Sequence, residues 1–361
     1  MFFMIILECC SKSSIGNYTK QRNPDYAGFT PFIDTLITQS YSFKYSFANA
    51  YRSGPAIPVI IAGMPSLMNE FYLLSAYSNN RIMGLGTLLA KKGYDCSFFH
   101  GADNGSLKFD RFSNVAGYQH YYGRTEYNNE KDYDGAWGIF DEPFMQFAAR
   151  TVDAKQKPFL ATLFTLSSHH PYILPEKYKG KFQKGTDPIY EMISYTDNAL
   201  RNFFNTASKM DWYENTLFVV LADHTAAVQY PEFSTEAGRM SIPIIFYDPS
   251  GEFPVGENDT TVMQQLDIIP TIMDYLQYDE PYFSFGYPIF DPNHKNFAIT
   301  YQGGIYQFIY ENYLYRFDMQ SPIALFDYRK DVLHNPNLLK AGMKVPGTLV
   351  TLSKAFLQHY K

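Results

Sequence analysis

The sequence predicts an α/β fold with a mostly parallel central sheet and a small C-terminal antiparallel subdomain. Short runs that are apolar throughout alternate with helical patterns, which indicates strands covered by helices on both faces. After residue 280 the pattern changes to short aromatic strands joined by tight turns, which is typical of an antiparallel meander. We therefore expect a main domain over residues 1–280 and a subdomain over 281–361 packed on its core.

The individual elements follow from apolar periodicity and from turn and capping residues. The predicted strands of the main sheet are Phe2–Leu7, Cys96–Phe99, Phe159–Leu166, Leu217–Ala222 and Ile242–Tyr247. One helix is expected to open at Thr30-Pro31, with Thr30 as its N-cap, and others to cover about Leu85–Lys92, Pro188–Met210 and Thr261–Leu276. The subdomain is expected to contain strands Phe297–Tyr301, Ile305–Tyr310 and Tyr313–Asp318 and a last helix over Thr348–Tyr360.

Composition restricts the classes of function. The chain has 361 residues, of which 46% are hydrophobic and 18% charged, so it builds a large core and is not disordered. The net charge is −6 and no Lys/Arg-rich run occurs, which argues against a nucleic-acid partner. Three cysteines, Cys9, Cys10 and Cys96, give neither a disulfide framework nor a zinc-ligand spacing. The apolar run Met1–Leu7 is too short for an export signal or a membrane span.

Residues with metal-binding or proton-transfer chemistry follow four of the predicted strands. In chain order these are Glu8, His100-Gly101, Ser167-Ser168-His169-His170-Pro171 and Asp223-His224. Because ligands of open α/β sheets bind beyond the carboxyl ends of the strands, we expect these side chains to gather at one edge. Aspartate oxygen and histidine nitrogen are good ligands for Zn²⁺ or Mn²⁺.

These residues also have plainer interpretations. Asp223 at a strand end is compatible with a loop cap beside a bystander His224, and Glu8 with a cap or an ion pair. His169 and His170 are suited to binding an oxyanion or donating a proton, but also to a polar loop held by backbone bonds.

Ser53 lies directly before a run of residues that predicts a helix beginning near Gly54. Prolines are tolerated in the first helical turn, and Pro55 and Pro58 are followed by the apolar run Val59–Ala62. The hydroxyl of Ser53 would then face a helix N-terminus, which is a ready site for phosphate or sulfate. The alternative is that Ser53 only caps the helix.

In this order, the motifs resemble the sulfatase-like branch of the alkaline phosphatase superfamily, and most of all the lipoteichoic acid synthase and phosphoglycerol transferase group. The resemblance covers about Ile5 to Phe290. It is carried by Ile6-Leu7-Glu8, Gly28–Asp34, Ala48–Ser53, Ala62–Leu67, Phe99-His100-Gly101, Trp137–Glu142, Ser168–Tyr172, Ala222-Asp223-His224-Thr225 and Ile242–Tyr247. It implies an alkaline-phosphatase-like α/β/α sandwich with its catalytic domain over residues 1–280.

The resemblance also implies roles for the site residues. Glu8, Asp223 and His224 match metal ligands of the family, and Ser53 matches its nucleophile, which also lies at the metal. The further expected residues are His169, as a catalytic and phosphate-binding histidine, and His100, Trp137 and Arg52, as substrate-binding residues. The implied cofactor is one divalent metal ion, Mn²⁺ first, with Zn²⁺ or Mg²⁺ as alternatives.

The expected reaction is transfer or hydrolysis of a phosphoglycerol- or phosphoethanolamine-type group through a phosphorylated Ser53. A divalent cation suits this chemistry because it lowers the pKa of a hydroxyl and offsets charge on phosphoryl oxygens. The expected substrate is a lipid head group or a glycan on the extracytoplasmic side. Family members carry membrane helices ahead of this domain, so we expect a truncated form anchored through a segment outside this chain, or a soluble relative.

The sequence departs from the family at two places and leaves two alternatives. Lipoteichoic acid synthases carry an aromatic residue and an arginine after their His-Gly pair, where this chain reads Leu107-Lys108-Phe109-Asp110-Arg111, so the resemblance does not extend to the phosphoglycerol pocket. A sulfatase would mature a Cys or Ser in C/S-x-P-x-R, but Ile57 replaces that arginine, and Cys9 replaces a second acidic residue after Glu8. The other alternative is a non-catalytic binding or scaffold relative.

Overall fold

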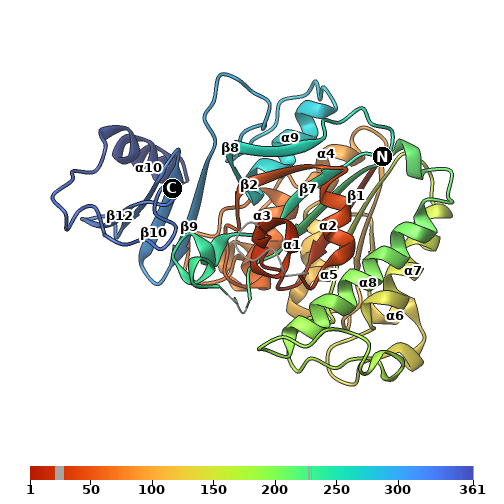
Figure 1. Ribbon diagram of the computed structural model, residues 1–361. Coiled ribbons are helices and arrows are strands. Elements are labelled where there is room, and N and C mark those ends of the chain that lie inside the picture. The colour runs from red at the N-terminus through yellow and green to blue at the C-terminus, as the bar shows by residue number, and fades with distance from the viewer. Residues whose placement is uncertain (21–27, 227, 229, 361) are drawn as a thin grey trace.

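The chain folds around two β-sheets of different size (Figure 1). The computed structural model describes residues 1–20, 28–226, 228 and 230–360. The main sheet has eight strands in the order β4-β3-β5-β1-β6-β7-β2-β8. Their bounds are β1 Phe2–Leu7, β2 Tyr41–Phe47, β3 Asp95–His100, β4 His120–Tyr122, β5 Phe159–Phe164, β6 Leu217–Ala222, β7 Ile244–Tyr247 and β8 Gly256–Gln264.

The main sheet is mostly parallel, as predicted. β1 lies between β5 and β6 and is parallel to both, and β3 is parallel to β4 and β5. Every residue of β1, β5 and β6 is buried, which explains why their sequences are apolar throughout. The predicted strand at Ile242–Tyr247 is observed as β7, but it is antiparallel to both β6 and β2 and does not belong to the parallel set.

Helices cover both faces of the main sheet and make a three-layer sandwich (Figure 1). One layer contains α2 (Pro31–Ile37), α7 (Asp141–Asp153) and α8 (Ile189–Ala207), and α8 contacts the other two. The opposite layer contains α3 (Ser53–Ala62), α4 (Leu85–Ala90), α5 (Phe109–Val115) and α9 (Ile268–Tyr275). Two single-turn helices, α1 (Gly16–Thr19) and α6 (Arg124–Tyr127), lie in the connections.

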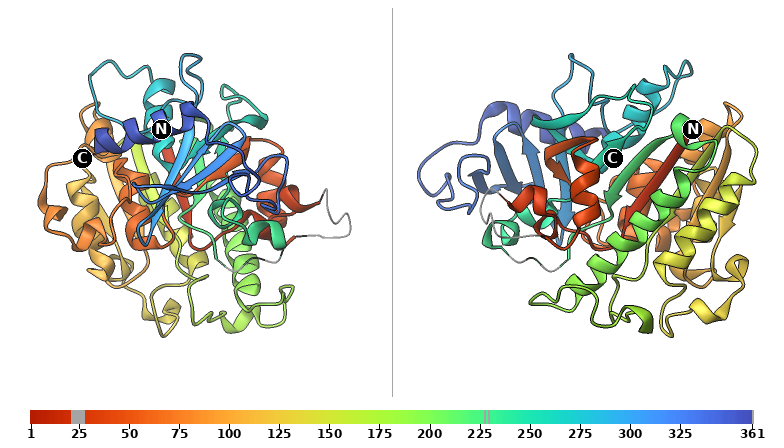
Figure 2. Two further views of the ribbon diagram at one scale, coloured as in Figure 1. Left: turned by 90° about the vertical axis from the view of Figure 1, so that its left-hand side faces the viewer. Right: turned by 45° about the vertical axis from the view of Figure 1, so that its right-hand side comes forward.

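The second sheet is antiparallel and has the order β12-β11-β10-β9. Its elements are β9 Phe297–Gln302, β10 Ile305–Tyr310, β11 Tyr313–Phe317, β12 Pro322–Asp327 and the helix α10 Gly347–Tyr360. Alternate residues point to opposite faces, so Phe297 and Phe308 pack with Phe356 of α10, while Ala298 and Ile309 pack with the end of the main sheet. Figure 2 shows this sheet and α10 together as one lobe beside the main sheet.

Two predicted elements differ from the structure. The expected helix Thr261–Leu276 begins only at Ile268, because the residues before it complete the edge strand β8. Thr30 stands at the N-cap position of α2, but its hydroxyl donates to the Ser14 carbonyl. The backbone N–H groups of Phe32 and Ile33 instead donate to Asp197 of α8, so another helix caps α2.

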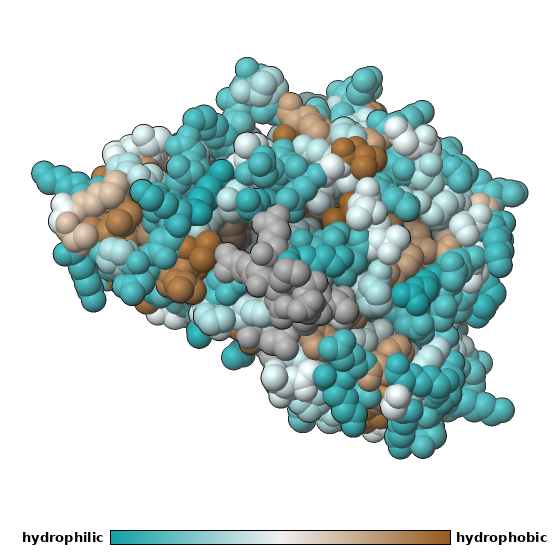
Figure 3. Space-filling view, in the orientation of Figure 1, coloured by the Kyte–Doolittle hydropathy of each residue, from teal (hydrophilic) through white to brown (hydrophobic). Residues whose placement is uncertain are grey.

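The surface seen in Figure 3 is largely hydrophilic, and apolar residues appear on it as separate patches. In the part of the chain that the structure describes, the helices fall short of the length and apolar character needed to span a bilayer.

Candidate active site

Glu8 and the Asp223-His224 pair lie side by side because they follow neighbouring parallel strands. Leu7 at the end of β1 is in register with Ala222 at the end of β6, so the chain leaves both strands at the same edge. The main chain of Glu8 is fixed from the other side as well: its N–H donates to Thr165 Oγ1 at 2.8 Å, and its carbonyl accepts from Ser168 Oγ at 2.7 Å. The predicted gathering of side chains at this edge is thus observed for these residues.

Asp223 is fully buried, and only one of its carboxylate oxygens is hydrogen-bonded. Oδ1 accepts the backbone N–H of Cys9 at 2.9 Å and that of His224 at 2.7 Å. Oδ2 finds no hydrogen-bond partner among the described residues and lies 3.4 Å from Nε2 of His224. Gln265 fixes the backbone below by donating to the Asp223 carbonyl at 2.7 Å. A buried carboxylate oxygen without a donor is costly unless a cation neutralises it.

The orientation of His224 leaves Nε2 free to act as an acceptor. Nδ1 lies 2.7 Å from the carbonyl oxygen of Thr225, and because a carbonyl can only accept, Nδ1 carries the proton. Histidine ligands of metals are commonly held in this way, by a hydrogen bond from the other ring nitrogen. Nε2 lies 3.3 Å from Ser53 Oγ and 3.7 Å from Glu8 Oε1.

Ser53 is the first residue of α3, and its hydroxyl is part of the same cluster. Ser53 Oγ donates to the Glu8 carboxylate, 3.1 Å from Oε2. The N-cap position belongs to Arg52, so capping, the alternative role for this serine, is not what the structure shows. The predicted start of the helix near Gly54 is correct to within one residue. The hydroxyl therefore lies at the positive end of a ten-residue helix and beside the carboxylate of Glu8.

The charges at this edge are unbalanced. Burial, and then the negative charge of Asp223, raise the pKa of Glu8 well above the usual range of a glutamate. Two carboxylates buried so near to each other are mutually repulsive until a proton or a cation lies between them. Oxygen ligands from Glu8, Asp223 and Ser53 and one nitrogen from His224 form a donor set that suits Mn²⁺, Zn²⁺ or Mg²⁺. The four predicted metal-site residues thus fit a divalent ion.

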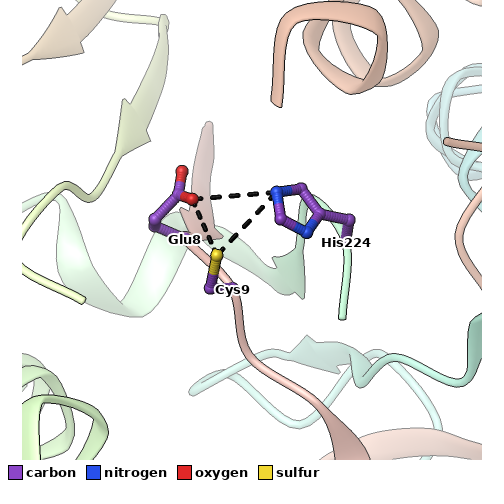
Figure 4. Close-up of side chains that lie close together, drawn as sticks. All are labelled: Glu8, Cys9 and His224. Carbon is purple, nitrogen blue, oxygen red and sulfur yellow. Dashed lines mark hydrogen bonds and ion pairs between the residues drawn. The ribbon is translucent and has the colours of Figure 1, made fainter. Parts of the chain in front are cut away.

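Cys9 is a fifth side chain in this cluster, and no role was predicted for it. Its sulfur lies 2.9 Å from Glu8 Oε1 and 3.8 Å from His224 Nε2. Figure 4 shows Glu8, Cys9 and His224 pointing toward one another, and one ligand atom from each lies within 4.8 Å of the others. The signal in the sequence was the position directly after a metal-ligand glutamate, but Cys9 was considered there only as a departure from the sulfatase pattern.

His100 ends β3, two strands from β1, and is buried. Its Nδ1 donates to the Phe164 carbonyl at 3.2 Å, and its ring stacks on that of Phe164 with centroids 4.7 Å apart. Burial lowers the pKa of His100 to about 4, while the Phe164 carbonyl and the charge of Asp223 act in the opposite direction. His100 is therefore neutral at pH 7, with Nε2 as a hydrogen-bond acceptor.

His169 and Trp137 form the more open side of the site. Their rings meet edge to face with centroids 4.4 Å apart, and Trp137 Nε1 donates to the His170 carbonyl at 2.6 Å. The next residue, Gly138, allows its loop to approach Gly101 closely, because a Cβ at this position would lie 2.3 Å from the Gly101 carbonyl oxygen. His169 Nδ1 donates to the His170 carbonyl at 2.8 Å, so its Nε2 is also an acceptor when the ring is neutral.

Arg52 is exposed and lies on another side of Ser53. It contributes, with Tyr51 and the turn Tyr301–Gly303, to a cavity of about 230 Å³ between the start of α3 and the second sheet. The structure thus brings together Glu8, Ser53, Asp223 and His224, and it places His169 against Trp137. The substrate-binding role predicted for Arg52, as for His100, His169 and Trp137, stays a prediction.

The family model named Sulfatase matches residues 2–278, which is most of the chain. The chain belongs to the Sulfatase family. Its curated relatives include a lipoteichoic acid synthase-like protein, YvgJ, of Bacillus subtilis, 22% identical over 310 residues that cover 79% of this chain and 49% of that protein. The lipoteichoic acid synthase of Staphylococcus aureus is 25% identical over 353 residues, covering 83% of this chain and 54% of that protein. The chain spans about half the length of these relatives.

Solved structures show the same fold for this Sulfatase family member. A protein of the alkaline phosphatase superfamily from Vibrio parahaemolyticus has a TM-score of 0.82 at 20% identity, covering 99% of this chain and 87% of that one. The lipoteichoic acid synthase LtaP from Listeria monocytogenes has a TM-score of 0.80 at 19% identity, covering 99% and 90%. The predicted resemblance and fold class are both confirmed.

Proposed function

We propose that this chain is the catalytic part of a divalent-metal phosphotransferase or phosphodiesterase that acts on phosphoglycerol- or phosphoethanolamine-type groups. The observation that carries the proposal is the position of Ser53 Oγ, 3.1 Å from Glu8 Oε2 and 3.3 Å from His224 Nε2 at the N-terminus of α3. A hydroxyl placed between metal-ligand side chains and a helix N-terminus is suited to attack phosphorus.

Glu8, Asp223, His224 and Ser53 would hold the metal ion. The unpaired Oδ2 of Asp223, the free Nε2 of His224 and the repulsion between the two carboxylates support this assignment. Such an ion supplies Lewis acidity, which lowers the pKa of a hydroxyl and offsets charge on phosphoryl oxygens.

The remaining steps, which are orienting the nucleophile and moving protons, are assigned to side chains of the protein. Glu8 Oε2 accepts the hydrogen bond of the Ser53 hydroxyl and so orients its oxygen. The new Oγ–P bond forms as the P–O bond to the donor alcohol breaks; the Ser53 hydroxyl gives up its proton, and the leaving alcohol takes up one proton. We propose His169, whose ring meets that of Trp137 edge to face, as the residue that contacts the phosphoryl group or transfers this proton. Water or a second alcohol then takes the phosphoryl group from Ser53.

The relatives support a substrate at the cell surface. Lipoteichoic acid synthases are among the curated proteins that this chain matches, and their names say that they make lipoteichoic acid. We therefore propose a lipid head group or a glycan as the substrate, on the extracytoplasmic side. Anchoring to the membrane through a segment outside this chain is part of the same proposal.

The test combines metal analysis with turnover of a chromogenic phosphodiester. We expect the purified protein to bind a divalent ion and to hydrolyse the ester, and we expect Ser53→Ala to lose activity by about 10³-fold or more while keeping the metal. Asp223→Ala should lose both. A chromogenic sulfate ester serves as the control substrate, because Ile57 lies in the core where a sulfatase motif places arginine. A wild-type protein that binds no metal and turns over neither ester would contradict the proposal.

A further inference from the structure

The backbone conformation of Cys9 does not favour a residue with a side chain, yet its side chain lies in the cluster. Its φ is 58°, in the left-handed region, where a side chain is disfavoured and glycine is not. This conformation sends the Cys9 N–H to Asp223 Oδ1 and, at the same time, turns the sulfur toward Glu8 Oε1 and His224 Nε2. A glycine would give the same N–H without the strain, so the backbone does not explain the sulfur.

A second observation at the same place points to a cation. Asp223 Oδ2 is fully buried and lacks a hydrogen-bond donor within the described ranges, and it lies on the same side as His224 Nε2. Two ligand atoms that bind one zinc ion at about 2.0–2.3 Å lie about 3–4 Å from each other. The separations of the Cys9 sulfur from Glu8 Oε1 and His224 Nε2, 2.9 Å and 3.8 Å, are close to this range.

We infer that Cys9 Sγ is an additional ligand of the metal, beside Glu8, Asp223, His224 and the Ser53 hydroxyl. The inference rests on the proposed function, since it assumes that a metal binds here. On binding, the thiol loses its proton to solvent and ligates as thiolate. A thiolate favours a softer ion than carboxylates do, so Zn²⁺ becomes the preferred ion over the Mn²⁺ that the resemblance suggests.

Cobalt substitution tests this with a readout other than activity. The metal-free protein is loaded with Co²⁺, and its absorption spectrum is compared with those of Cys9→Ser, Cys10→Ser and Cys96→Ser. We expect a near-ultraviolet thiolate-to-cobalt charge-transfer band in the wild type and in the Cys10 and Cys96 variants, which alter buried sulfurs. Cys9→Ser, which keeps a donor for Glu8, should bind cobalt without that band. Its preference for Zn²⁺ over Mn²⁺ in competition should fall about tenfold or more.

Cys9→Gly guards against a folding defect, because glycine suits the φ of 58° and keeps the N–H to Asp223. It should also lose the band. A wild-type protein that binds cobalt without a charge-transfer band, or a Cys9→Ser variant with the wild-type spectrum and ion preference, would overturn the inference while the metal site stands. A wild-type protein that binds none of Co²⁺, Zn²⁺, Mn²⁺ and Mg²⁺ would overturn the proposed function as well.

Discussion

Two buried aspartates at the same edge of the main sheet show different chemistry. Asp141, at the start of α7, accepts the N–H of Leu166 at 2.8 Å, the N–H of Ser167 at 3.2 Å and the hydroxyl of Thr196 at 2.8 Å. Both of its oxygens are therefore satisfied. Asp223 is equally buried, but its Oδ2 has no donor in the described part of the chain.

The difference in hydrogen bonding indicates a structural role for Asp141 and a metal-binding role for Asp223. A carboxylate whose oxygens are all bonded to main-chain N–H groups ties loops together and needs no other partner. A carboxylate with one free oxygen, close to a second acid such as Glu8, is unfavourable in the isolated protein and becomes favourable when a cation binds. Burial alone does not distinguish the two cases, whereas the hydrogen-bond partners of each oxygen do.

The largest expected effect on metal affinity is that of Asp223→Asn. Removing a ligand charge should weaken metal binding by about 100-fold or more, since even supporting residues change affinity by about 10–100-fold. The metal-free variant should be at least as stable as the wild type, because a repulsive buried charge has gone. Calorimetric metal titration and urea unfolding measure these two quantities. A variant with wild-type metal affinity would remove Asp223 from the site.

Asp141→Ala should give the opposite result. Three donors lose their acceptor, so we expect the free energy of unfolding to fall by about 3 kcal/mol. Metal affinity should change much less than in Asp223→Asn, and the same two measurements apply. Equal loss of metal affinity in both variants would erase the distinction between the two carboxylates.

A third buried aspartate, Asp197, is expected to make the stability of the protein depend on pH. Burial raises its pKa to about 7, even though the N–H groups of Phe32 and Ile33 act to lower it. Because this folded-state pKa lies above the unfolded value near 4, the folded protein binds more protons between these pH values. Its contribution to stability is therefore full below about pH 4 and is lost as the pH rises toward 7.

The measurement is urea unfolding of metal-free wild type and Asp197→Asn at pH 5 and pH 7. In the wild type, we expect titration of Asp197 to lower the free energy of unfolding by about 2 kcal/mol between pH 5 and pH 7. In the variant, this part of the pH dependence should be absent. The same slope in both proteins would show that Asp197 does not titrate there.

The smallest expected effect is on the open side of the site. Trp137→Phe keeps the ring against His169 but loses the hydrogen bond to the His170 carbonyl. We expect KM for a phosphodiester to rise about threefold, with kcat and metal affinity nearly unchanged, because one exposed hydrogen bond contributes about 1 kcal/mol or less. A fall in metal affinity would show that Trp137 acts on the buried side.

The sequence was most informative where strands are buried on both faces. β1, β5 and β6 are apolar throughout, so their ends, and with them Glu8 and Asp223, could be located without a structure. The last four residues of β8, Thr261–Gln264, were predicted as the start of a helix because the first five residues of this strand are polar and give no apolar strand signal. β2 was missed because the search was for runs that are apolar throughout, whereas in β2 aromatic residues alternate with Ser42, Lys44 and Ser46.

Only the residues of the site that stand in local sequence motifs could be predicted. Ser53, Glu8, Asp223 and His224 stand in recognisable motifs, but the donors around them come from distant segments. Gln265 supports the Asp223 carbonyl from 42 residues away and has no local signature. Similarly, Thr30 has the residue type of a helix cap, yet the cap of α2 comes from Asp197, 164 residues from Ile33.

The central place of β1 has a consequence for how the protein is made. Glu8 and Cys9 bond to Thr165 and Asp223, which lie 157 and 214 residues further along the chain. During synthesis the apolar strand β1 therefore has neither of its neighbours until β5 and then β6 leave the ribosome. Folding of such non-local pairs is slow, and an unpaired apolar strand is prone to aggregate in the meantime. We expect nascent chains to depend on chaperones until residue 224 has emerged.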